Sequence, residues 1–304
     1  AWLHQNLPEG GFVAISMDTC KEWFPTFWGL ILSGHEVLLL DAAMSDELAL
    51  HLMGEAGCKA MVTPRKREFS EDIAQVLTAD LFACPKAELP QVACGNAVAL
   101  CTSGTTGTSR IFVYNGEAMA EQVLSSLLLY NANKRIVANE NRRALAFLPF
   151  HHVLGFVVNL MWCGFLGYAN IYLKDRAPKT IMTTAQRLKP HLIVAVPLLA
   201  NNLCTTIKKK LAKKPLMTRA AFSAMTGLSL NTQRFAPTAG LHFAQKMLFK
   251  GLLNQALGTE VQCVILGGSH TPVEHLRMLN ALGYYTVCGF GMTETAVTSV
   301  ETSM

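Results

Sequence analysis

The sequence predicts an α/β fold, a layered sandwich of largely parallel sheets with helices. Short apolar segments of strand type alternate with helical patterns of about ten residues, which is the order of parallel βαβ units. Hydrophobic residues make up 51% of the 304 residues and charged residues only 15%. A large buried core is therefore expected, and a disordered chain or a coiled coil is excluded.

The first 95 residues show this alternation most clearly. Apolar runs bounded by turn residues predict three strands, over residues 11–17, 36–40 and 59–63. Helical spacing predicts a helix over residues 20–33 that ends at Gly34. A second helix is predicted to begin after an N-cap at Ser45 and to end before Gly57. Residues 64–95 are mixed in composition, and their prolines indicate loops.

The same alternation continues to the end of the chain. Strands are predicted over residues 98–101, 111–114, 143–148, 169–173, 191–196, 261–266 and 285–288. Helices are predicted over residues 116–131, 178–188, 197–214, 218–257 with a break at 234–239, and 272–282. The uncharged stretch 153–173 could span a bilayer core of roughly 30 Å. Its glycines and asparagines instead indicate a buried helix, a turn and a strand.

Charge and cysteine content restrict the class of protein. The net charge is +5, and a basic run holds Lys208, Lys209, Lys210, Lys213, Lys214 and Arg219. Such a run is more often a solvated helix face than a site for anionic lipid or nucleic acid. No aromatic residues interleave it, so nucleic acid is not expected, while peripheral membrane contact stays open. The nine cysteines are scattered, and none has the spacing of a zinc site, which predicts free thiols in a reducing compartment. Residues 1–15 show no signal peptide, so a cytoplasmic protein is expected.

The segment VALCTSGTTGTSR at residues 98–110 is the strongest functional signal. A strand-type run is followed by eight residues that are all Ser, Thr or Gly, and then by Arg110. Glycines let the backbone approach a ligand, while hydroxyls and the cation attract anions, so a polyphosphate is the natural ligand. A polar hairpin turn is the alternative. A Walker A loop is excluded because Gly104 and Gly107 are only three residues apart and no Lys follows.

The order of residues in this segment resembles the phosphate-binding signature of the adenylate-forming superfamily, which includes acyl-CoA synthetases and the adenylation domains of peptide synthetases. The usual continuation, Gly-x-Pro-Lys-Gly, is replaced here by Gly-Thr-Ser-Arg-Ile, so that Arg110 stands in place of the family's Lys. The resemblance implies an ATP phosphate site formed by Thr102, Ser103, Gly104, Thr105, Thr106, Gly107 and Arg110.

Two further segments resemble the other signatures of this superfamily. FLPFHHVLGF at residues 147–156 places His152 where the family's His borders the carboxylate pocket and helps to gate it. CGFGMTET at residues 288–295 resembles Gly-Tyr-Gly-x-Thr-Glu. This likeness implies that Phe290 stacks on adenine, Thr293 contacts the α-phosphate and Glu294 binds Mg²⁺. A single carboxylate beside phosphates suits Mg²⁺ chemistry.

The turn after the strand at 261–266 resembles the superfamily's adenine-pocket loop. A plain strand-to-helix turn is the alternative for these residues. The nucleotide site implied for this part of the chain comprises Gly267, Gly268, Ser269, Gly289, Phe290, Gly291, Met292 and Thr293. The catalytic residues implied by the resemblance are Thr293, Glu294 and His152.

From Gly11 onward the chain is most similar to long-chain acyl-CoA synthetases. The resemblance implies a ligase that uses ATP and Mg²⁺ to convert a medium- or long-chain fatty acid to an acyl-adenylate, with CoA as the acceptor. Residues 1–304 would form a truncated N-terminal AMP-binding domain, without the β-barrel subdomain and the C-terminal lid. A non-catalytic acyl- or nucleotide-binding module and an adenylation unit that loads a carrier protein are the alternatives. Apolar residues at helical spacing after His152 favour a fatty acid or simply pack the core: Val153, Leu154, Phe156, Val157, Leu160 and Met161.

Overall fold

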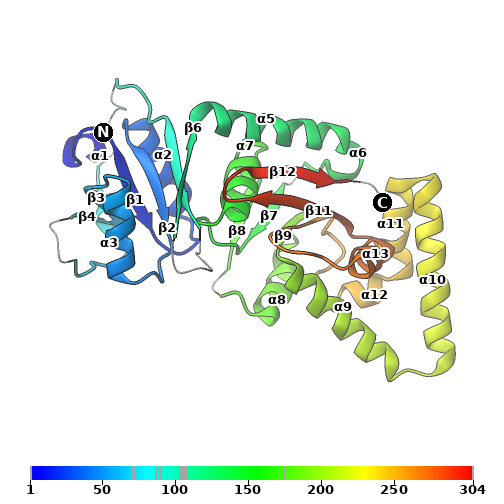
Figure 1. Ribbon diagram of the computed structural model, residues 1–304. Helices are drawn as coiled ribbons and strands as arrows, with labels where there is room; N and C mark the ends of the chain where they lie inside the picture. The colour runs from blue at the N-terminus through cyan, green and yellow to red at the C-terminus, as the bar shows by residue number, and fades with distance from the viewer. Residues whose placement is uncertain are drawn as a thin grey trace. The chain divides into compact units, whose positions relative to one another are not determined.

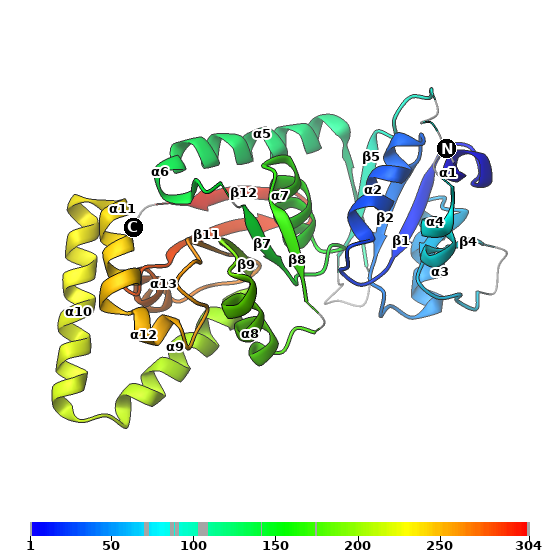
Figure 2. The ribbon, with the colours of Figure 1, turned by 180° about the vertical axis from the view of Figure 1, so that it is seen from behind.

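The computed structural model describes residues 2–69, 73–85, 88, 91–102, 109–140, 142–173 and 175–302. The chain forms two compact units (Figures 1 and 2). Unit 1 comprises Ala1–Val123 and Pro149–Phe156, and unit 2 comprises Leu124–Leu148 and Val157–Met304. Each unit contains one six-stranded sheet in which all but one of the strands run parallel. The prediction of an α/β fold with largely parallel sheets is confirmed.

The sheet of unit 1 has the order β4-β3-β1-β2-β5-β6, and only β6 is antiparallel to its neighbour. Its strands are β1 (Phe12–Ser16), β2 (Glu36–Leu40), β3 (Ala60–Thr63), β4 (Ala74–Leu77), β5 (Ala97–Cys101) and β6 (Ile111–Asn115). The helices that accompany it are α1 (Trp2–Asn6), α2 (Trp23–Leu32), α3 (Asp46–Glu55) and α4 (Thr78–Ala83). Parallel neighbours need crossover connections, which α2 and α3 supply.

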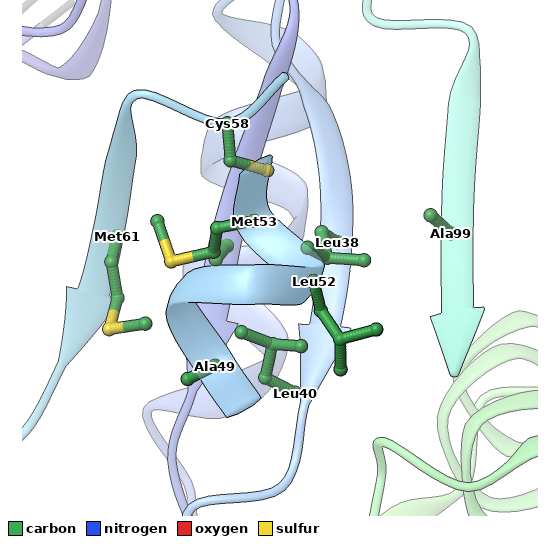
Figure 3. Packing of buried hydrophobic residues seen from close by; sticks show 9 residues of the cluster. Leu38, Leu40, Ala49, Leu52, Met53, Cys58, Met61 and Ala99 are labelled. Atoms are coloured by element: carbon green, nitrogen blue, oxygen red, sulfur yellow. The ribbon is translucent and has the colours of Figure 1, made fainter. Parts of the chain in front are cut away.

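Helix α3 shows how local sequence and packing agree in unit 1. The hydroxyl of Ser45 accepts a hydrogen bond from the Leu48 N–H at 3.3 Å, which confirms the predicted N-cap. Gly57 follows the helix with a φ of 68°, a left-handed conformation that favours glycine. Figure 3 shows Ala49, Leu52 and Met53 on the buried face of the helix beside apolar side chains of the sheet, namely Leu38, Leu40 and Met61. Each fully buried Leu or Met contributes about 1.5–3 kcal/mol.

The sheet of unit 2 has the order β12-β11-β10-β9-β7-β8, and only β12 is antiparallel. Its strands are β7 (Arg143–Ala146), β8 (Ala169–Tyr172), β9 (Leu192–Ala195), β10 (Cys263–Leu266), β11 (Tyr285–Met292) and β12 (Ala296–Glu301). The helices of the second half are α5 (Gly116–Ala132), α6 (Lys134–Val137), the π-helix η1 (Gly155–Trp162), α7 (Cys163–Phe165), α8 (Pro178–Leu188), α9 (Pro197–Ala212), α10 (Leu216–Phe235), α11 (Pro237–Phe243), the π-helix η2 (Ala244–Leu248), α12 (Lys250–Leu253) and α13 (Val273–Ala281).

The structure differs from the sequence-based prediction at several places, among them α1 and α6, which were not predicted. β4 and α4 lie within residues 64–95, where no strand or helix was predicted. β11 continues four residues past the predicted end at Cys288, because β12 pairs with this extension. Residues 153–173 form η1, α7, a turn at Gly167 and β8, as predicted, but β8 is only partly buried. Within the described part of the chain, no helix has the length and apolar character needed to cross a membrane.

Candidate functional site

The carboxyl edge of the sheet in unit 2 brings together two of the predicted nucleotide segments. Leu266 at the end of β10 is paired in parallel with Cys288 of β11. Residues 267–269 therefore leave the sheet beside residues 289–291. The Gly267 N–H donates to the Ala195 carbonyl oxygen at 3.1 Å, and Gly268 has a φ of 87°. This edge is where open α/β sheets bind their ligands.

The β11–β12 hairpin holds the predicted Gly-x-Gly segment in a strand, where the sequence indicated a loop. A β-bulge falls between Phe290 and Gly291. A Cβ at Gly291 would lie 3.0 Å from the Val297 Cα and closer still to the Ala296 carbonyl oxygen. Only glycine fits at this close approach of two backbones. The Thr295 N–H donates to the Met292 carbonyl oxygen at 3.2 Å and closes the turn.

The hairpin presents both an aromatic ring and a carboxylate to solvent. Phe290 is 60% exposed, which leaves a ring face accessible on a paired strand. Glu294 is exposed in the turn at residues 293–295, and Thr293 beside it is half-buried. The described residues contain no group of three or more His, Cys, Asp or Glu that could hold a metal ion.

In unit 1, the structure describes the base of the predicted phosphate loop. The Thr102 N–H donates to the Arg110 carbonyl oxygen at 2.9 Å, and the Arg110 N–H donates to the Thr102 hydroxyl at 3.0 Å. The strand predicted over residues 111–114 is confirmed as β6, which pairs antiparallel with the preceding strand β5. The Arg110 side chain is exposed and borders a shallow hollow that Phe12 and Glu55 also line. The remaining predicted residues lie outside the described residues: Ser103, Gly104, Thr105, Thr106 and Gly107.

The two adjacent histidines of unit 1 have different surroundings. His152, the predicted site residue, is exposed, and its ring centroid lies 4.3 Å from that of His151. The His151 Nε2 atom lies 3.6 Å from a carboxylate oxygen of Asp41, the residue that follows β2. Phe150, in the same segment, packs edge-on against the Trp23 ring of α2 at 5.3 Å. The segment that carries His152 is thus anchored to α2 and to the end of β2.

Sequence analysis did not identify Arg67, which lies buried at the carboxyl edge of the unit 1 sheet. Its guanidinium donates to the Asp46 carboxylate at 2.6 Å, to the Met44 carbonyl oxygen at 2.6 Å and to the Ser16 hydroxyl at 3.1 Å. These contacts join the segment after β3 to the end of β1 and to the start of α3. No sequence signal marks Arg67, because its partners lie far away in the chain.

Comparison with known sequences identifies the family. A family model described as "AMP-binding enzyme" matches residues 1–304. The chain belongs to the AMP-binding enzyme family. It is 22% identical over 336 residues to long chain acyl-CoA synthetase 8 of Arabidopsis thaliana, covering 93% of this chain and 45% of that protein. It is 26% identical over 217 residues to long-chain-fatty-acid–CoA ligase 4 of Saccharomyces cerevisiae, covering 69% of this chain and 28% of the ligase. The chain spans less than half the length of these curated relatives.

Solved structures of AMP-binding proteins share the fold. The o-succinylbenzoate CoA synthetase of Bacillus subtilis, solved with ATP and magnesium, has a TM-score of 0.69 at 16% identity, over 99% of this chain and 54% of the synthetase. The peptide synthetase FmoA3, solved with AMPPNP, has a TM-score of 0.69 at 15% identity, over 99% of this chain and 28% of that protein. At these identities the likeness shows the fold.

Proposed function

We propose that this AMP-binding chain belongs to an acid–thiol ligase that activates a fatty acid with ATP and then transfers the acyl group to CoA. The observation that carries the proposal is the β11–β12 hairpin, which presents Phe290 and Glu294 beside the turn at residues 267–269. Curated relatives named as long-chain acyl-CoA synthetases support the fatty acid and CoA as substrates.

Each residue of the hairpin has a role in this proposal. Phe290 would stack on the adenine base, and the glycine turn at residues 267–269 would let backbone groups approach its edge. The Thr293 hydroxyl would donate to the α-phosphate, and Glu294 would hold Mg²⁺, which neutralises phosphate charge when bound. A carboxylate oxygen of the acid attacks the α-phosphorus, and the bond to pyrophosphate breaks. Donors already in place stabilise the charge that develops at the phosphate.

In unit 1, the proposal assigns roles to the phosphate loop and to His152. Hydroxyls and backbone N–H groups of the loop at residues 102–110 would bind the outgoing phosphates, and Arg110 would add a positive charge. The hydrogen bonds between Thr102 and Arg110 support this role because they fix both ends of the loop. His152 would border the carboxylate of the acid. The contact of the neighbouring His151 with Asp41 at 3.6 Å supports this role, because it packs the segment that carries His152 against the end of β2.

Unit 2 contains an apolar cavity of about 80 Å³, whose lining has the apolar character that an acyl chain requires. Val158, Trp162 and Cys163 line it from η1 and α7, and Ile265 and Val287 line it from the sheet. An apolar cavity of about 150 Å³ accommodates benzene, so a long acyl chain requires the lining side chains to move apart. The apolar residues after His152, which were expected to border the acid or to pack the core, are partly or fully buried. Four of them belong to the core: Phe156, Val157, Leu160 and Met161.

Pyrophosphate exchange by the full-length protein tests the substrate. We expect exchange with a series of straight-chain acids, and an apparent affinity that rises about fourfold with each added methylene until the pocket is full, since each buried methylene contributes about 0.8 kcal/mol. Benzoate and amino acids are the controls. A flat response, or a preference for the controls, would remove the fatty acid and leave adenylation in place. Exchange without acyl-CoA formation would favour a carrier protein as acceptor.

Substitution of Glu294 tests the nucleotide site separately. Glu294→Gln keeps the shape of the side chain but removes the charge, so Mg²⁺-dependent ATP binding should weaken by about tenfold or more, as lost charge-assisted contacts commonly do. Glu121→Gln, an exposed glutamate of α5, is the matched control. Calorimetric titration of the full-length protein with ATP, with and without Mg²⁺, measures the effect. An affinity equal to that of the control would remove Glu294 from the proposed role.

A further inference from the structure

The helical hairpin formed by α9 and α10 in unit 2 (Figure 1) has two strongly exposed apolar side chains at its tip. α9 ends at Ala212 and α10 begins at Leu216, so the connection is only three residues long. Leu216 is 76% exposed and Met217 is 85% exposed. Exposed apolar residues are ordinary when they occur singly, but two neighbours at one tip form a patch.

The charge around this tip has one sign. Residues 176–259 contain thirteen Lys and Arg and no Asp or Glu, whereas the rest of the chain contains the other thirteen Lys and Arg together with all 21 Asp and Glu. Six of the thirteen lie near the tip of the hairpin, all exposed: Lys208, Lys209, Lys210, Lys213, Lys214 and Arg219. Lys208 pairs with Glu274 at 3.2 Å. A surface of this kind attracts polyanions and anionic membranes.

A groove beside the tip combines the same two properties. It has a volume of about 480 Å³ and lies between α9, α10 and α12. Apolar side chains from all three helices line it, among them Ile207, Phe222 and Leu252, while Lys210 and Lys214 also contribute to its lining. The groove therefore fits a molecule with an apolar chain and an anionic head group, which is the chemistry of a phospholipid.

We propose that the α9–α10 tip binds the surface of a bilayer that contains anionic phospholipids. Leu216 and Met217 enter the boundary between head groups and acyl chains, and the surrounding lysines bind lipid phosphates. The exposed groups at the tip are aliphatic, which favours lipid over single-stranded nucleic acid, because the latter is bound by exposed aromatic rings. The inference is independent of the proposed ligase activity.

Co-sedimentation of the full-length protein with vesicles tests the proposal. We expect binding to vesicles of equal amounts of phosphatidylcholine and phosphatidylserine, little binding to phosphatidylcholine alone, and weaker binding at high salt. Each basic residue near such a surface is worth about fivefold in binding, so Lys213→Gln with Lys214→Gln should weaken binding on the order of 25-fold. Leu216→Ser with Met217→Ser should weaken it by about tenfold or more.

Matched controls are available on the exposed surface of unit 2. Lys134→Gln with Arg135→Gln on α6 removes the same charge, and Leu128→Ser on α5 removes a similarly exposed apolar side chain. Both should bind vesicles like the unmodified protein. Equal binding to neutral and anionic vesicles, an equal loss in the controls, or displacement of the vesicles by a single-stranded RNA would overturn the proposal. Unchanged urea midpoints of all variants show that folding is intact.

Discussion

Gly291 in the β11–β12 hairpin cannot carry a side chain without a change in the backbone. A Cβ there would meet the Val297 Cα at 3.0 Å and the Ala296 carbonyl oxygen at a shorter distance. Both atoms belong to the backbone of β12, so no side-chain rotation relieves the clash. Gly291→Ala must therefore open the hairpin next to its bulge.

The expected cost follows from two contributions. Overpacking of this kind costs about 1–3 kcal/mol. Opening the ladder also weakens at least one backbone hydrogen bond, which is worth about 0.5–1.5 kcal/mol. The free energy of unfolding should fall by about 2–4 kcal/mol. With an m-value of about 2 kcal/mol/M, the urea midpoint moves down by about 1–2 M.

Gly289 provides a control in the same strand. A Cβ at Gly289 would lie 3.8 Å from the Leu266 carbonyl oxygen and 4.0 Å from the Ser299 carbonyl oxygen, which are ordinary contacts. Gly289→Ala should therefore leave the urea midpoint of the full-length protein nearly unchanged. Stability is the appropriate measurement, because both glycines lie in the proposed nucleotide site. Equal midpoints for the two variants would refute the argument from close backbone approach.

Two further predictions concern unit 1. Arg67→Met removes the donor that bonds the Met44 carbonyl and the Ser16 hydroxyl, so the free energy of unfolding measured in urea should fall by about 3 kcal/mol. Arg65→Met, at an exposed arginine, is the control, and an equal loss in both variants would contradict the prediction. Burial lowers the pKa of His35 below its ordinary 6.5. At a pH under about 6.5 the unfolded chain therefore binds a proton that the folded chain does not. As the pH is lowered through this range, the free energy of unfolding should decrease by at most about 1.4 kcal/mol per pH unit. His35→Phe should flatten this slope, whereas the exposed His242→Gln should not; an unchanged slope in His35→Phe would contradict the assignment.

Elements with strong local signals were predicted closely. The predicted bounds of α8 and β2 match the structure, because Pro178 begins the helix and the strand is a short, fully apolar run after its first residue. β4 was missed because it is an edge strand with a weak pattern, and it exists through its pairing with β3. The end of β11 was missed for a similar reason, since its glycines have no preference for a strand and β12 supplies the pairing.

In the candidate site too, residues with a local sequence signal were predicted, and contacts that depend on tertiary structure were not. Motif order indicated Phe290, Thr293 and Glu294, whereas the contact between Asp41 and His151 depends on tertiary structure. The apolar stripe after His152 was analysed with a period of 3.6 residues. The structure shows a π-helix there, whose hydrogen bonds run from residue i to i+5. Different side chains therefore face the cavity.

The two predicted phosphate and nucleotide segments share one topological property: each connects an antiparallel pair at the edge of its sheet, β5–β6 or β11–β12. All the other pairs in the two sheets are parallel and depend on longer crossovers. A hairpin connection can gain residues without displacing a crossover helix, and each doubling of its length costs only about 0.6 kcal/mol in closure entropy. These two connections are therefore where the length of the chain can vary most freely while the order of the strands is kept.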